Sequence, residues 1–243
     1  MSFKLYNGDC LEVMKAIPDN SIDLIFCDLP YGNITKCKWD CPIDLNKLWK
    51  EYKRIKKERT PIFLCCNTML GVDLIKSTTI PFKYELIWKK SQSSNHFLSS
   101  KQPLRLHEFI YVFYDKAPFY DLSSHKSLYK TNKKTSYNSI YGSNPITNHG
   151  IIGKSTGTPR YDPPLPTSIL EIASQRTKHS TQKPVDLMKF CLKYYSKEND
   201  IILDNCMGSG STGVACKEMN RRFIGIEMDK DIFKVAEERL NSV

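Results

Sequence analysis

The sequence predicts an α/β domain with a mostly parallel sheet of seven strands and helices on both faces. Short apolar runs alternate with amphipathic segments along the chain, as they do in strand–helix–strand units. A glycine-rich loop late in the chain precedes another such segment. The length of 243 residues suits one large domain or one domain with an insertion.

Seven runs are predicted to be strands. Ile22–Cys27 and Ile201–Asn205 are dense in apolar residues rather than alternating, which is typical of strands covered on both faces. The other five are Phe3–Tyr6, Pro61–Cys66, Tyr84–Trp88, Glu108–Tyr114 and Arg222–Glu227.

Six segments have the apolar spacing of helices. In the last one, Ile232, Ala236 and Leu240 recur at the period that directs one helix face towards a sheet. Pro184 stands at the start of another, where a first-turn proline is tolerated. The expected helices are Leu11–Ile17, Leu45–Lys57, Met69–Lys76, Val185–Ser196, Thr212–Met219 and Asp231–Leu240.

Residues 115–178 have no sustained period and are too many for a plain loop, so they indicate an insertion or disorder. The net charge of the chain is +10, and residues 116–183 alone hold ten Lys or Arg against three acids, with tyrosines interleaved. This composition favours a nucleic-acid partner, although a solvated surface loop has similar charge. We therefore divide the chain into core residues 1–115, an insert 116–178 and core residues 179–243.

Other protein classes fit the sequence poorly. No run reaches the roughly 18 consecutive apolar residues of a membrane span, and the polar N-terminus lacks the apolar core of a secretion signal. We expect a cytoplasmic protein that does not associate with membranes. The nine cysteines are expected to be reduced thiols, and no metal site is expected because no second ligand pair matches Cys37 and Cys41.

Two polar loops contain the residues that indicate a ligand-binding or catalytic site. Asp28-Leu29-Pro30-Tyr31 follows one predicted strand, and the loop from Asp204 to Gly213 follows another. Ligands of open α/β sheets bind beyond the carboxyl ends of the strands, so both loops are expected to line one cavity.

The second loop also fits a dinucleotide-binding fingerprint, because Gly208, Gly210 and Gly213 have its spacing and Glu227 ends the next strand. Few residues follow Glu227, so the rest of the sheet must come from the N-terminal part. The fold is therefore expected to be circularly permuted. A nicotinamide enzyme is disfavoured, since that function does not need the Asp-Leu-Pro-Tyr loop.

Asp28-Leu-Pro-Tyr31 resembles the D-P-P-Y catalytic motif of amino-methylating DNA methyltransferases, and Asp204–Thr212 resembles their D-P-F-x-G-S-G-[ST]-T cofactor loop. The order of the two loops, with a recognition region between them, is that of the β group of this N6-adenine/N4-cytosine family. Four further segments resemble family elements: Asn7-Gly-Asp-Cys10, Trp88-Lys-Lys with Arg105-x-His-Glu108, Ser180–Pro184, and Phe223–Glu227. The resemblance implies a Rossmann-like methyltransferase sheet and S-adenosylmethionine as methyl donor.

The resemblance assigns catalysis to Asp28, Leu29, Pro30 and Tyr31. An exocyclic amino group is a poor nucleophile, and two acceptors, the Asp28 carboxylate and the Leu29 carbonyl, would hold its N–H bonds so that the lone pair faces the sulfonium methyl. The target base must leave the duplex, and Tyr31 would stack on it while Pro30 stiffens the turn. The alternative for Asp28 is a capping aspartate, and for Tyr31 a packed core aromatic.

The resemblance also implies a cofactor site. Glu227 would accept from the ribose hydroxyls and Asp9 from the adenine amino group, whereas Lys183 would close the methionine end or contact phosphate. Asn205 and Cys206 depart from the family's Pro-Phe, and Leu29 departs from its first proline. The implied cofactor residues are Asp9, Asp28, Lys183, Asp204, Gly208, Ser209, Gly210, Thr212 and Glu227.

The favoured function is site-specific methylation of adenine N6 in double-stranded DNA. N4-cytosine methylation, methylation of RNA or protein, and a catalytically idle DNA-binding subunit remain alternatives. A homodimer and a cognate restriction endonuclease are further partners that the resemblance leaves open. The insert is expected to recognise the target, with DNA contacts from Lys130, Lys133, Lys134, Lys154, Arg160, Arg176 and Lys178.

Overall fold

The computed structural model describes residues 3–31, 41–94, 96–128, 161–174 and 182–242. The chain forms two compact units, one of Met1–Asp121 with Ser168–Val243 and one of Leu122–Thr167. The smaller unit lies within the insert expected from the sequence. Its described residues pair β6 (Lys126–Ser127) antiparallel with β7 (Tyr161–Asp162).

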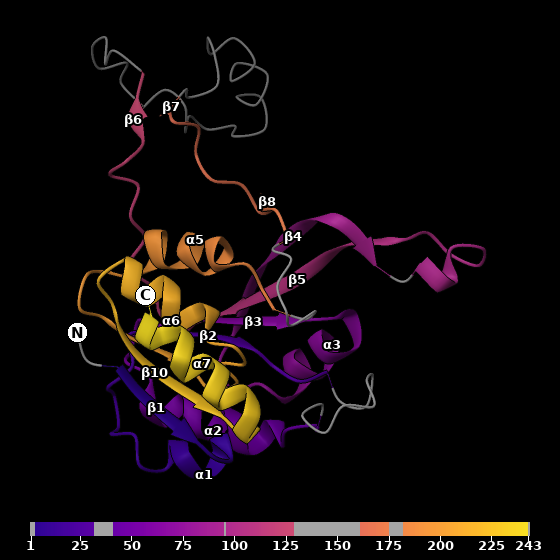
Figure 1. The fold of residues 1–243 in the computed structure, drawn as a ribbon. Helices are drawn as coiled ribbons and strands as arrows, with labels where there is room; N and C mark the ends of the chain where they lie inside the picture. The colour runs from indigo at the N-terminus through magenta and orange to yellow at the C-terminus, as the bar shows by residue number, and fades with distance from the viewer. Residues whose placement is uncertain (1–2, 32–40, 95, 129–160, 175–181, 243) are drawn as a thin grey trace, which may run out of the picture. The chain divides into compact units, whose positions relative to one another are not determined.

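The larger unit is built on an eight-stranded sheet with the order β1-β10-β9-β2-β3-β5-β4-β8 (Figure 1). The first five strands are parallel, β5 is antiparallel to both β3 and β4, and β8 is parallel to β4. The strands are β1 (Phe3–Asn7), β2 (Leu24–Asp28), β3 (Ile62–Cys66), β4 (Phe82–Ser94), β5 (Arg105–Phe113), β8 (Ile169–Glu171), β9 (Ile201–Asp204) and β10 (Arg222–Glu227).

All seven predicted strands are confirmed, and so is the circular permutation, because β9 and β10 lie between β1 and β2. The eighth strand, β8, was not predicted. It has only three residues, and Leu170 alone is buried, so it lacks the dense apolar run of a central strand. Ile169–Glu171 pairs with β4 at the sheet edge, which removes these residues from the insert.

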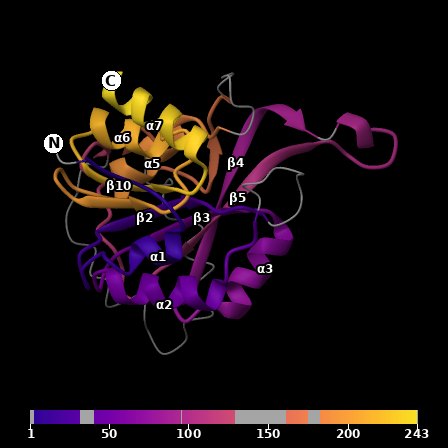
Figure 2. The same ribbon diagram turned by 60° about the horizontal axis from the view of Figure 1, so that its bottom comes forward.

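Of the helices that the structure describes, three cover each face of the sheet (Figures 1 and 2). Side chains of α5, α6 and α7 share one apolar cluster, and those of α1, α2 and α3 share the other. The helices are α1 (Cys10–Met14), α2 (Leu45–Ile55), α3 (Thr68–Ser77), α5 (Val185–Tyr195), α6 (Ser211–Glu218) and α7 (Lys230–Ser242).

Strand β2 lies between these two apolar clusters. Leu24 and Phe26 belong to the first cluster, whereas Ile25 and Cys27 belong to the second, as the two-residue period of a strand requires. This double burial explains why the run is apolar at successive positions.

Polar caps fix where the helices on the second face begin. The carboxylate of Asp9 accepts from the Leu11 N–H, and Asp44 and Asn67 cap α2 and α3 in the same way. Pro184 is the N-cap of α5, one position before the first turn in which the sequence placed it.

The paired strands β4 and β5 extend further than predicted and continue past the end of β3 (Figure 1). Strand β3 ends at Cys66, opposite Phe109, but β4 and β5 remain paired at Lys89 with His107 and at Ser94 with Arg105. A 3-10 turn, η1 (His96–Leu98), lies between them. Among the described helices, none is both long and apolar enough to cross a membrane.

Candidate active site

The candidate site lies at the carboxyl edge of the parallel strands. In the register of the sheet Ile25 is opposite Leu203, Gly225 is opposite Asp204, and Asn7 is opposite Glu227. The carboxyl ends of β1, β10, β9 and β2 are therefore neighbours. This arrangement brings the loop after Asp28 and the loop after Asp204 to the same edge, as the sequence predicts.

Asp28 lies in a network of charged groups that come from three separate segments. Its Oδ2 lies 2.7 Å from Lys183 Nζ, and the Tyr31 hydroxyl lies 3.4 Å from its Oδ1. Lys183 also contacts Glu108 Oε2 at 3.1 Å, and Lys90 contacts Glu108 Oε1 at 3.0 Å. Two carboxylates and two ammonium groups thus form a compact neutral cluster.

Burial and neighbouring charge set the pKa values in this cluster. Burial raises the pKa of Asp28, and Lys183 only partly offsets it. Burial also acts to raise the pKa of Glu108, but Lys183 and Lys90 outweigh it and lower that pKa. Burial acts to lower the pKa of Lys183, yet Asp28, Tyr31 and Glu108 raise it well above its ordinary value. Lys183 is therefore a cation shared by two carboxylates.

The rest of the Asp28 loop is anchored in the core. The Leu29 side chain is only 3% exposed and packs in the apolar cluster of α1, α2 and α3. The Asp28 side chain is 30% exposed, so it remains accessible from the site. Tyr31 is partly buried, and Lys183 Nζ lies 5.8 Å from its ring centroid.

The glycine-rich loop has the geometry of a backbone cradle. Gly208 and Gly210 have φ angles of 52° and 80°, which side chains rarely tolerate, and a Cβ on Gly208 would meet nothing within 4 Å. Buried Asp204 fixes the loop, because its Oδ2 accepts from the Thr212 hydroxyl at 2.6 Å and its Oδ1 from the Cys206 N–H at 3.2 Å. The loop therefore leaves open space at Gly208.

Glu227 joins this loop to the end of β10. Its Oε2 accepts from the Gly208 N–H at 3.0 Å, and its Oε1 accepts from the Asp229 N–H at 2.8 Å. Asp229 caps the next helix through its own side chain, bonding the N–H groups of Asp231 and Ile232. Each oxygen of the Glu227 carboxylate keeps acceptor capacity for another donor.

Gln182 brings a buried polar atom to the cofactor loop. Its Oε1 accepts from the Ser209 hydroxyl at 2.9 Å, whereas its Nε2 is buried and has no hydrogen-bond partner among the described residues. Arg239 Nη1 holds the same loop through the Ser209 carbonyl at 3.1 Å and Ser211 Oγ at 3.2 Å. An unpaired buried amide is costly, so a bound acceptor at this point would be stabilised.

Asp204 gives a testable dependence of stability on pH. Burial raises its pKa to about 7, far above that of an unfolded aspartate. The folded protein therefore holds a proton that the unfolded chain releases between about pH 4 and pH 7. This tighter binding of the proton stabilises the folded protein. We expect the stabilisation to be fully present at about pH 4 and to be lost as the pH rises to about 7.

Asp204→Asn should remove that contribution while keeping an acceptor for Thr212. Denaturant unfolding of both proteins from pH 4 to 8 measures it as the difference between the two curves. Burial also raises the pKa values of Asp28 and Glu227, but both residues are present in the two proteins, so most of their own contribution cancels in this difference. A difference that stays constant across the range would contradict the assignment.

Asp9 lies beside Glu227, because the N–H of Gly8 bonds the Glu227 carbonyl at 3.0 Å. The structure shows Asp9 as the cap of α1 and does not test its expected contact with a base. The seven expected DNA contacts lie outside the described residues; they are Lys130, Lys133, Lys134, Lys154, Arg160, Arg176 and Lys178.

Sequence reasoning did not single out Glu108, Lys90 or Gln182. All three lie in segments that resemble the family, but the residues alone gave no role to any of them. A carboxylate at the start of an apolar strand, with a lysine pair on a neighbouring strand, was the available signal for Glu108. Asn205 departs from the family motif, yet it is held by the Tyr52 hydroxyl at 2.5 Å.

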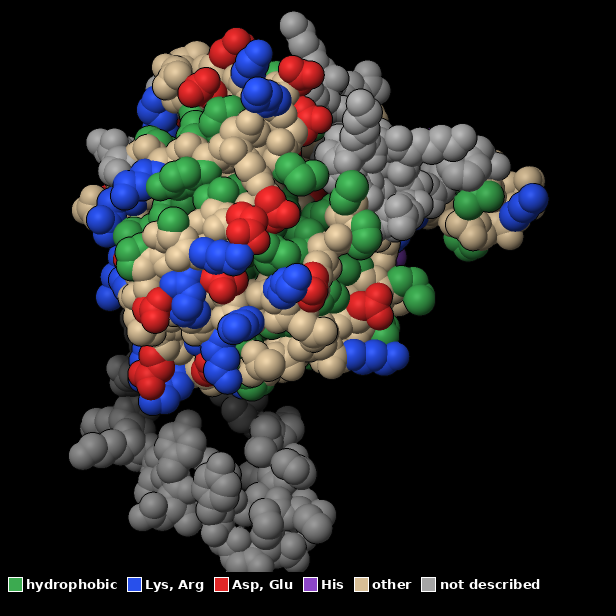
Figure 3. Space-filling model, turned by 90° about the horizontal axis from the view of Figure 1, so that it is seen from below, with side chains coloured by type: hydrophobic (Ala, Val, Ile, Leu, Met, Phe, Trp, Pro, Cys, Tyr) green, Lys and Arg blue, Asp and Glu red, His purple; other side chains and the backbone are tan. Residues whose placement is uncertain are grey.

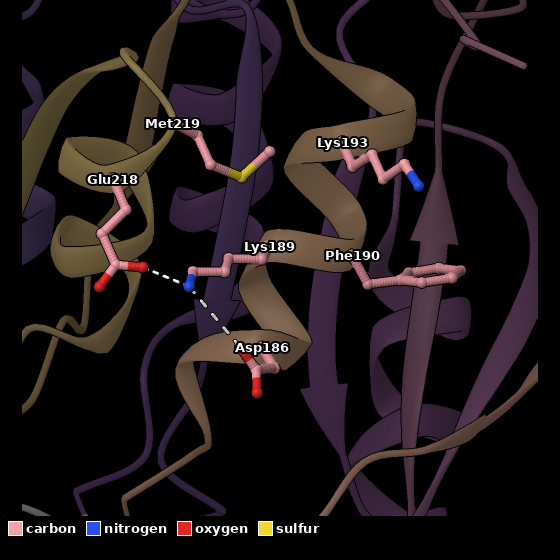
Figure 4. A pocket seen from close by; sticks show the side chains of 6 residues that line it. All are labelled: Asp186, Lys189, Phe190, Lys193, Glu218 and Met219. Atoms are coloured by element: carbon pink, nitrogen blue, oxygen red, sulfur yellow. Dashed lines mark ion pairs between the residues drawn. The ribbon is translucent and has the colours of Figure 1, made fainter. Parts of the chain in front are cut away.

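A hollow between α5 and α6 contains none of the predicted site residues (Figure 4). Lys189 lies across it and forms ion pairs with Asp186 and Glu218, so its charges are mutually compensated. Seven of the described cysteines are free thiols, namely Cys10, Cys27, Cys65, Cys66, Cys191, Cys206 and Cys216. In the described ranges no group of three His, Cys, Asp or Glu side chains could hold a metal ion.

Comparison with known proteins identifies relatives over the whole fold. A family model described as DNA methylase (N6_N4_Mtase) matches residues 22–238. The chain is 28% identical to DNA adenine methyltransferase YhdJ of Escherichia coli K12, over 98% of this chain and 82% of that protein. It is 26% identical to type II methyltransferase M.HinfI of Haemophilus influenzae, over 98% of this chain and 68% of that protein.

Two solved structures share the fold at low sequence identity. The M1.HpyAVI–SAM complex has a TM-score of 0.63 and 23% identity, covering 98% of this chain and 100% of that one. The PvuII DNA methyltransferase, named as cytosine-N4-specific, has a TM-score of 0.71 and 14% identity, covering 98% and 86%.

Proposed function

The chain belongs to the N6/N4 family of DNA methylases, and from this premise we propose that it transfers a methyl group from S-adenosylmethionine to adenine N6 in double-stranded DNA. The observation that carries the proposal is the meeting of the Asp28 loop and the glycine-rich loop at one edge of the sheet. One loop offers acceptors for an amino group, and the other offers a cradle for the methyl donor.

In the proposed reaction Asp28 accepts one N–H of the base, and the Leu29 carbonyl accepts the other. S-Adenosylmethionine, when bound, supplies a sulfonium methyl that is activated towards nucleophiles. The amino nitrogen forms a bond to the methyl carbon as the carbon–sulfur bond breaks, and the sulfur keeps the electron pair of that bond. The nitrogen then loses one proton, for which the Asp28 carboxylate is the nearest proposed acceptor. Acceptors held ready for developing positive charge account for much of such catalysis.

Lys183 has a defined part in this proposal. In the structure it bonds the carboxylate that must bind the base, at 2.7 Å. A base amino group therefore shares Asp28 with Lys183 or displaces it towards Glu108, which Lys183 already contacts. Lys183 therefore compensates the negative charge of Asp28 before the base binds.

Tyr31 is proposed to stack on the extruded base. The amino group is inaccessible to the enzyme inside a duplex, so the base must flip out. Stacking of the extruded base on an aromatic ring contributes about 1–3 kcal/mol per base. The Tyr31 hydroxyl lies within 3.5 Å of the Asp28 and Glu108 carboxylates, and these contacts hold the ring beside Asp28.

The residues at the glycine-rich loop fit S-adenosylmethionine. Glu227 offers acceptor capacity for ribose hydroxyls, and Gln182 Nε2, which has no partner among the described residues, offers a donor for an anionic group such as the methionine carboxylate. We further propose that Asp9 accepts from the adenine amino group of the cofactor, and that the Asp204–Thr212 bond, Ser209 and Gly210 hold the cradle in shape.

Glu227→Ala tests the cofactor assignment. We expect the Kd for S-adenosylmethionine to rise about 10- to 100-fold, because hydrogen bonds to a charged group contribute about 1.5–3 kcal/mol. Titration calorimetry measures the Kd, and thermal unfolding of the same sample separates a lost contact from a lost fold. An unchanged Kd in a folded variant would remove Glu227 from the cofactor site.

The choice of adenine rests on two observations. In the family, an aspartate at the first catalytic position is associated mostly with adenine, and this chain has Asp28 there. YhdJ, a relative over the whole chain, is named an adenine methyltransferase. N4-cytosine is the second candidate, because the PvuII enzyme with the same fold is named cytosine-N4-specific.

Labelled transfer tests the proposed function. The protein is incubated with methyl-labelled S-adenosylmethionine and genomic or mixed-sequence duplex DNA, and the DNA is digested to nucleosides. We expect label in N6-methyladenine. Label in N4-methylcytosine would overturn the base assignment, and no label despite duplex binding would favour the idle subunit.

We also propose double-stranded DNA as the partner, with the insert of residues 116–178, apart from strand β8, as the recognition region. Its excess of basic residues over acidic residues supports contacts with phosphate. The relative M.HinfI is named a type II methyltransferase, which supports a cognate endonuclease as a further partner. A homodimer remains part of the proposal and is tested by the molecular mass in solution.

A further inference from the structure

The hairpin of β4 and β5 overhangs the proposed catalytic edge. Strand β5 runs antiparallel to β3, so its residues before Phe109 lie beyond the carboxyl end of β3. Asp28 is opposite Cys65, next to that same end. We use the name hairpin arm for residues 89–107, which project from the sheet in Figures 1 and 2. The base of the arm therefore lies beside the position where Asp28 would receive a base.

The composition of the arm differs from that of the core surface. Residues 89–107 contain four Lys or Arg and two His but no Asp or Glu, and most of the others are Ser, Gln or Asn. Figure 3 shows the end of the arm with a basic side chain, whereas acidic and basic side chains are interspersed over the neighbouring core. The arm therefore has a positive field of its own, as a polyanion-binding surface requires.

Two of these four cations are compensated at the base of the arm. Lys90 pairs with Glu108 at 3.0 Å, and Lys89 pairs with Glu171 of β8 at 2.7 Å. Lys101 is exposed near the tip, and Arg105 donates its Nε–H to the His107 carbonyl at 3.2 Å. That bond uses one of the five guanidinium N–H groups, so Arg105 retains donors for an anion.

The arm begins beside the proposed catalytic site, because Glu108 at its base contacts residues of that site. Glu108 contacts Lys183 and lies within 3.5 Å of the Tyr31 hydroxyl, and Arg105 precedes it by three residues on the same strand. Three residues of an extended strand span about 10 Å. A DNA strand carries one phosphate per roughly 3.4 Å of helix axis, so Arg105 is in reach of phosphates that flank a base held at Asp28.

We propose that the hairpin arm is a second DNA-binding surface, in which Arg105 and Lys101 bind the phosphate backbone next to the target base. This proposal rests on the proposed function, and it adds an element outside the insert to the DNA interface. Phosphate contacts of this kind set position and affinity but carry no sequence information. The hydroxyl and amide side chains of the arm are further donors to phosphate.

Leu104 and Leu106 are 38% and 39% exposed on the same arm, and they give the competing interpretation of a protein-contact surface. We favour DNA because the two leucines stand among cations and polar side chains, without acidic residues to pair with. A charge variant and a leucine variant of the arm distinguish the two interpretations.

The test compares Lys101→Gln/Arg105→Gln with a matched control, Lys50→Gln/Lys53→Gln, which removes two exposed lysines from α2. Binding of the full-length proteins to a 30-bp mixed-sequence duplex is measured by fluorescence anisotropy from 50 to 200 mM salt. Each phosphate contact contributes about 0.9 to the slope of log K against log salt. We expect the arm variant to lose about 1.8 from this slope and the control variant to retain it.

The same slope predicts the change in affinity. The ratio of wild-type to variant affinity should be about 12-fold larger at 50 mM than at 200 mM salt. Equal slopes for the wild type and the folded arm variant would overturn the proposal. A change of oligomeric state in Leu104→Ser/Leu106→Ser, with the DNA slope of the charge variant unchanged, would instead assign the arm to protein contact.

This outcome is separable from the proposed function. Anisotropy on a mixed-sequence duplex needs no recognition site and no methyl transfer. If wild-type protein methylates DNA and the arm variant binds with the wild-type slope, only the proposal for the arm fails. If wild-type protein transfers no label but the arm variant loses slope, the methyltransferase proposal fails and the arm remains a DNA-binding surface.

Discussion

Replacing Asp28 with alanine is expected to lower the rate of methyl transfer by at least about 10²–10³-fold, the effect of removing one preorganised catalytic group. The carboxylate is the acceptor proposed to hold the base amino group, and Lys183, its partner at 2.7 Å, cannot replace it because an ammonium group has no acceptor. The Kd for S-adenosylmethionine should change less than a few-fold, since the proposed cofactor contacts come from Asp9, Gln182, Glu227 and the glycine-rich loop. Single-turnover transfer to DNA and calorimetry measure the two effects.

Asp28→Asn is the matched control for this result. The asparagine keeps the shape and one acceptor but loses the charge, so its transfer rate should lie between those of the wild type and Asp28→Ala. Near-normal turnover by the folded alanine variant would show that Asp28 is not the catalytic acceptor.

Replacing Lys183 with methionine is expected to change both stability and the pH profile. Asp28 and Glu108 share this cation, and their side chains are only 30% and 19% exposed. Breaking a buried ion pair by removing one partner costs about 3–5 kcal/mol, and the partial exposure of Asp28 places the expected loss near the lower end. Urea unfolding at neutral pH measures this loss.

The pH profile follows from the signs of the same interactions. Burial and Glu108 both raise the pKa of Asp28, while Lys183 lowers it. Without Lys183 the pKa of Asp28 rises further, so Asp28 becomes ionised only at higher pH. Because transfer requires the ionised carboxylate, the acid limb of the transfer rate should move to higher pH.

The double variant Lys183→Met/Glu108→Gln distinguishes the effect of charge on the pKa of Asp28 from a general loss of structure. Removing the second carboxylate should move the acid limb back to lower pH and recover part of the stability, with Lys90 left as the nearby cation. If the single and double variants have the same acid limb, charge coupling between Glu108 and Asp28 is not what sets the profile.

Much of the fold could be predicted because burial leaves a strong local pattern. The runs that became β2 and β9 are apolar at successive positions, and this pattern arises from helices on both faces of the sheet. Their polar ends, at Asp28 and Asp204, could then be placed at one edge from the rule that parallel strands end together. The circular permutation followed from the position of the glycine-rich loop near the C-terminus.

The features that could not be predicted depend on contacts between distant residues. Strand β8 is three residues long and gains its regularity only by pairing with β4. Glu108 joins the catalytic cluster because β5 is inserted antiparallel beside β3, which its own sequence does not specify. The partnership of Lys183 with Asp28 spans 155 positions along the chain, and the sequence assigned this lysine to the cofactor or to phosphate.

A crystal structure of the protein with bound S-adenosylmethionine tests whether the Asp28 loop and the glycine-rich loop form one active site. We expect ribose hydroxyls on Glu227, the methionine carboxylate beside Gln182, and the sulfonium methyl facing the Asp28 carboxylate across a space that fits one base. A cofactor bound elsewhere, or one bound at the glycine-rich loop with its methyl directed away from Asp28, would show that the two loops do not share the reaction.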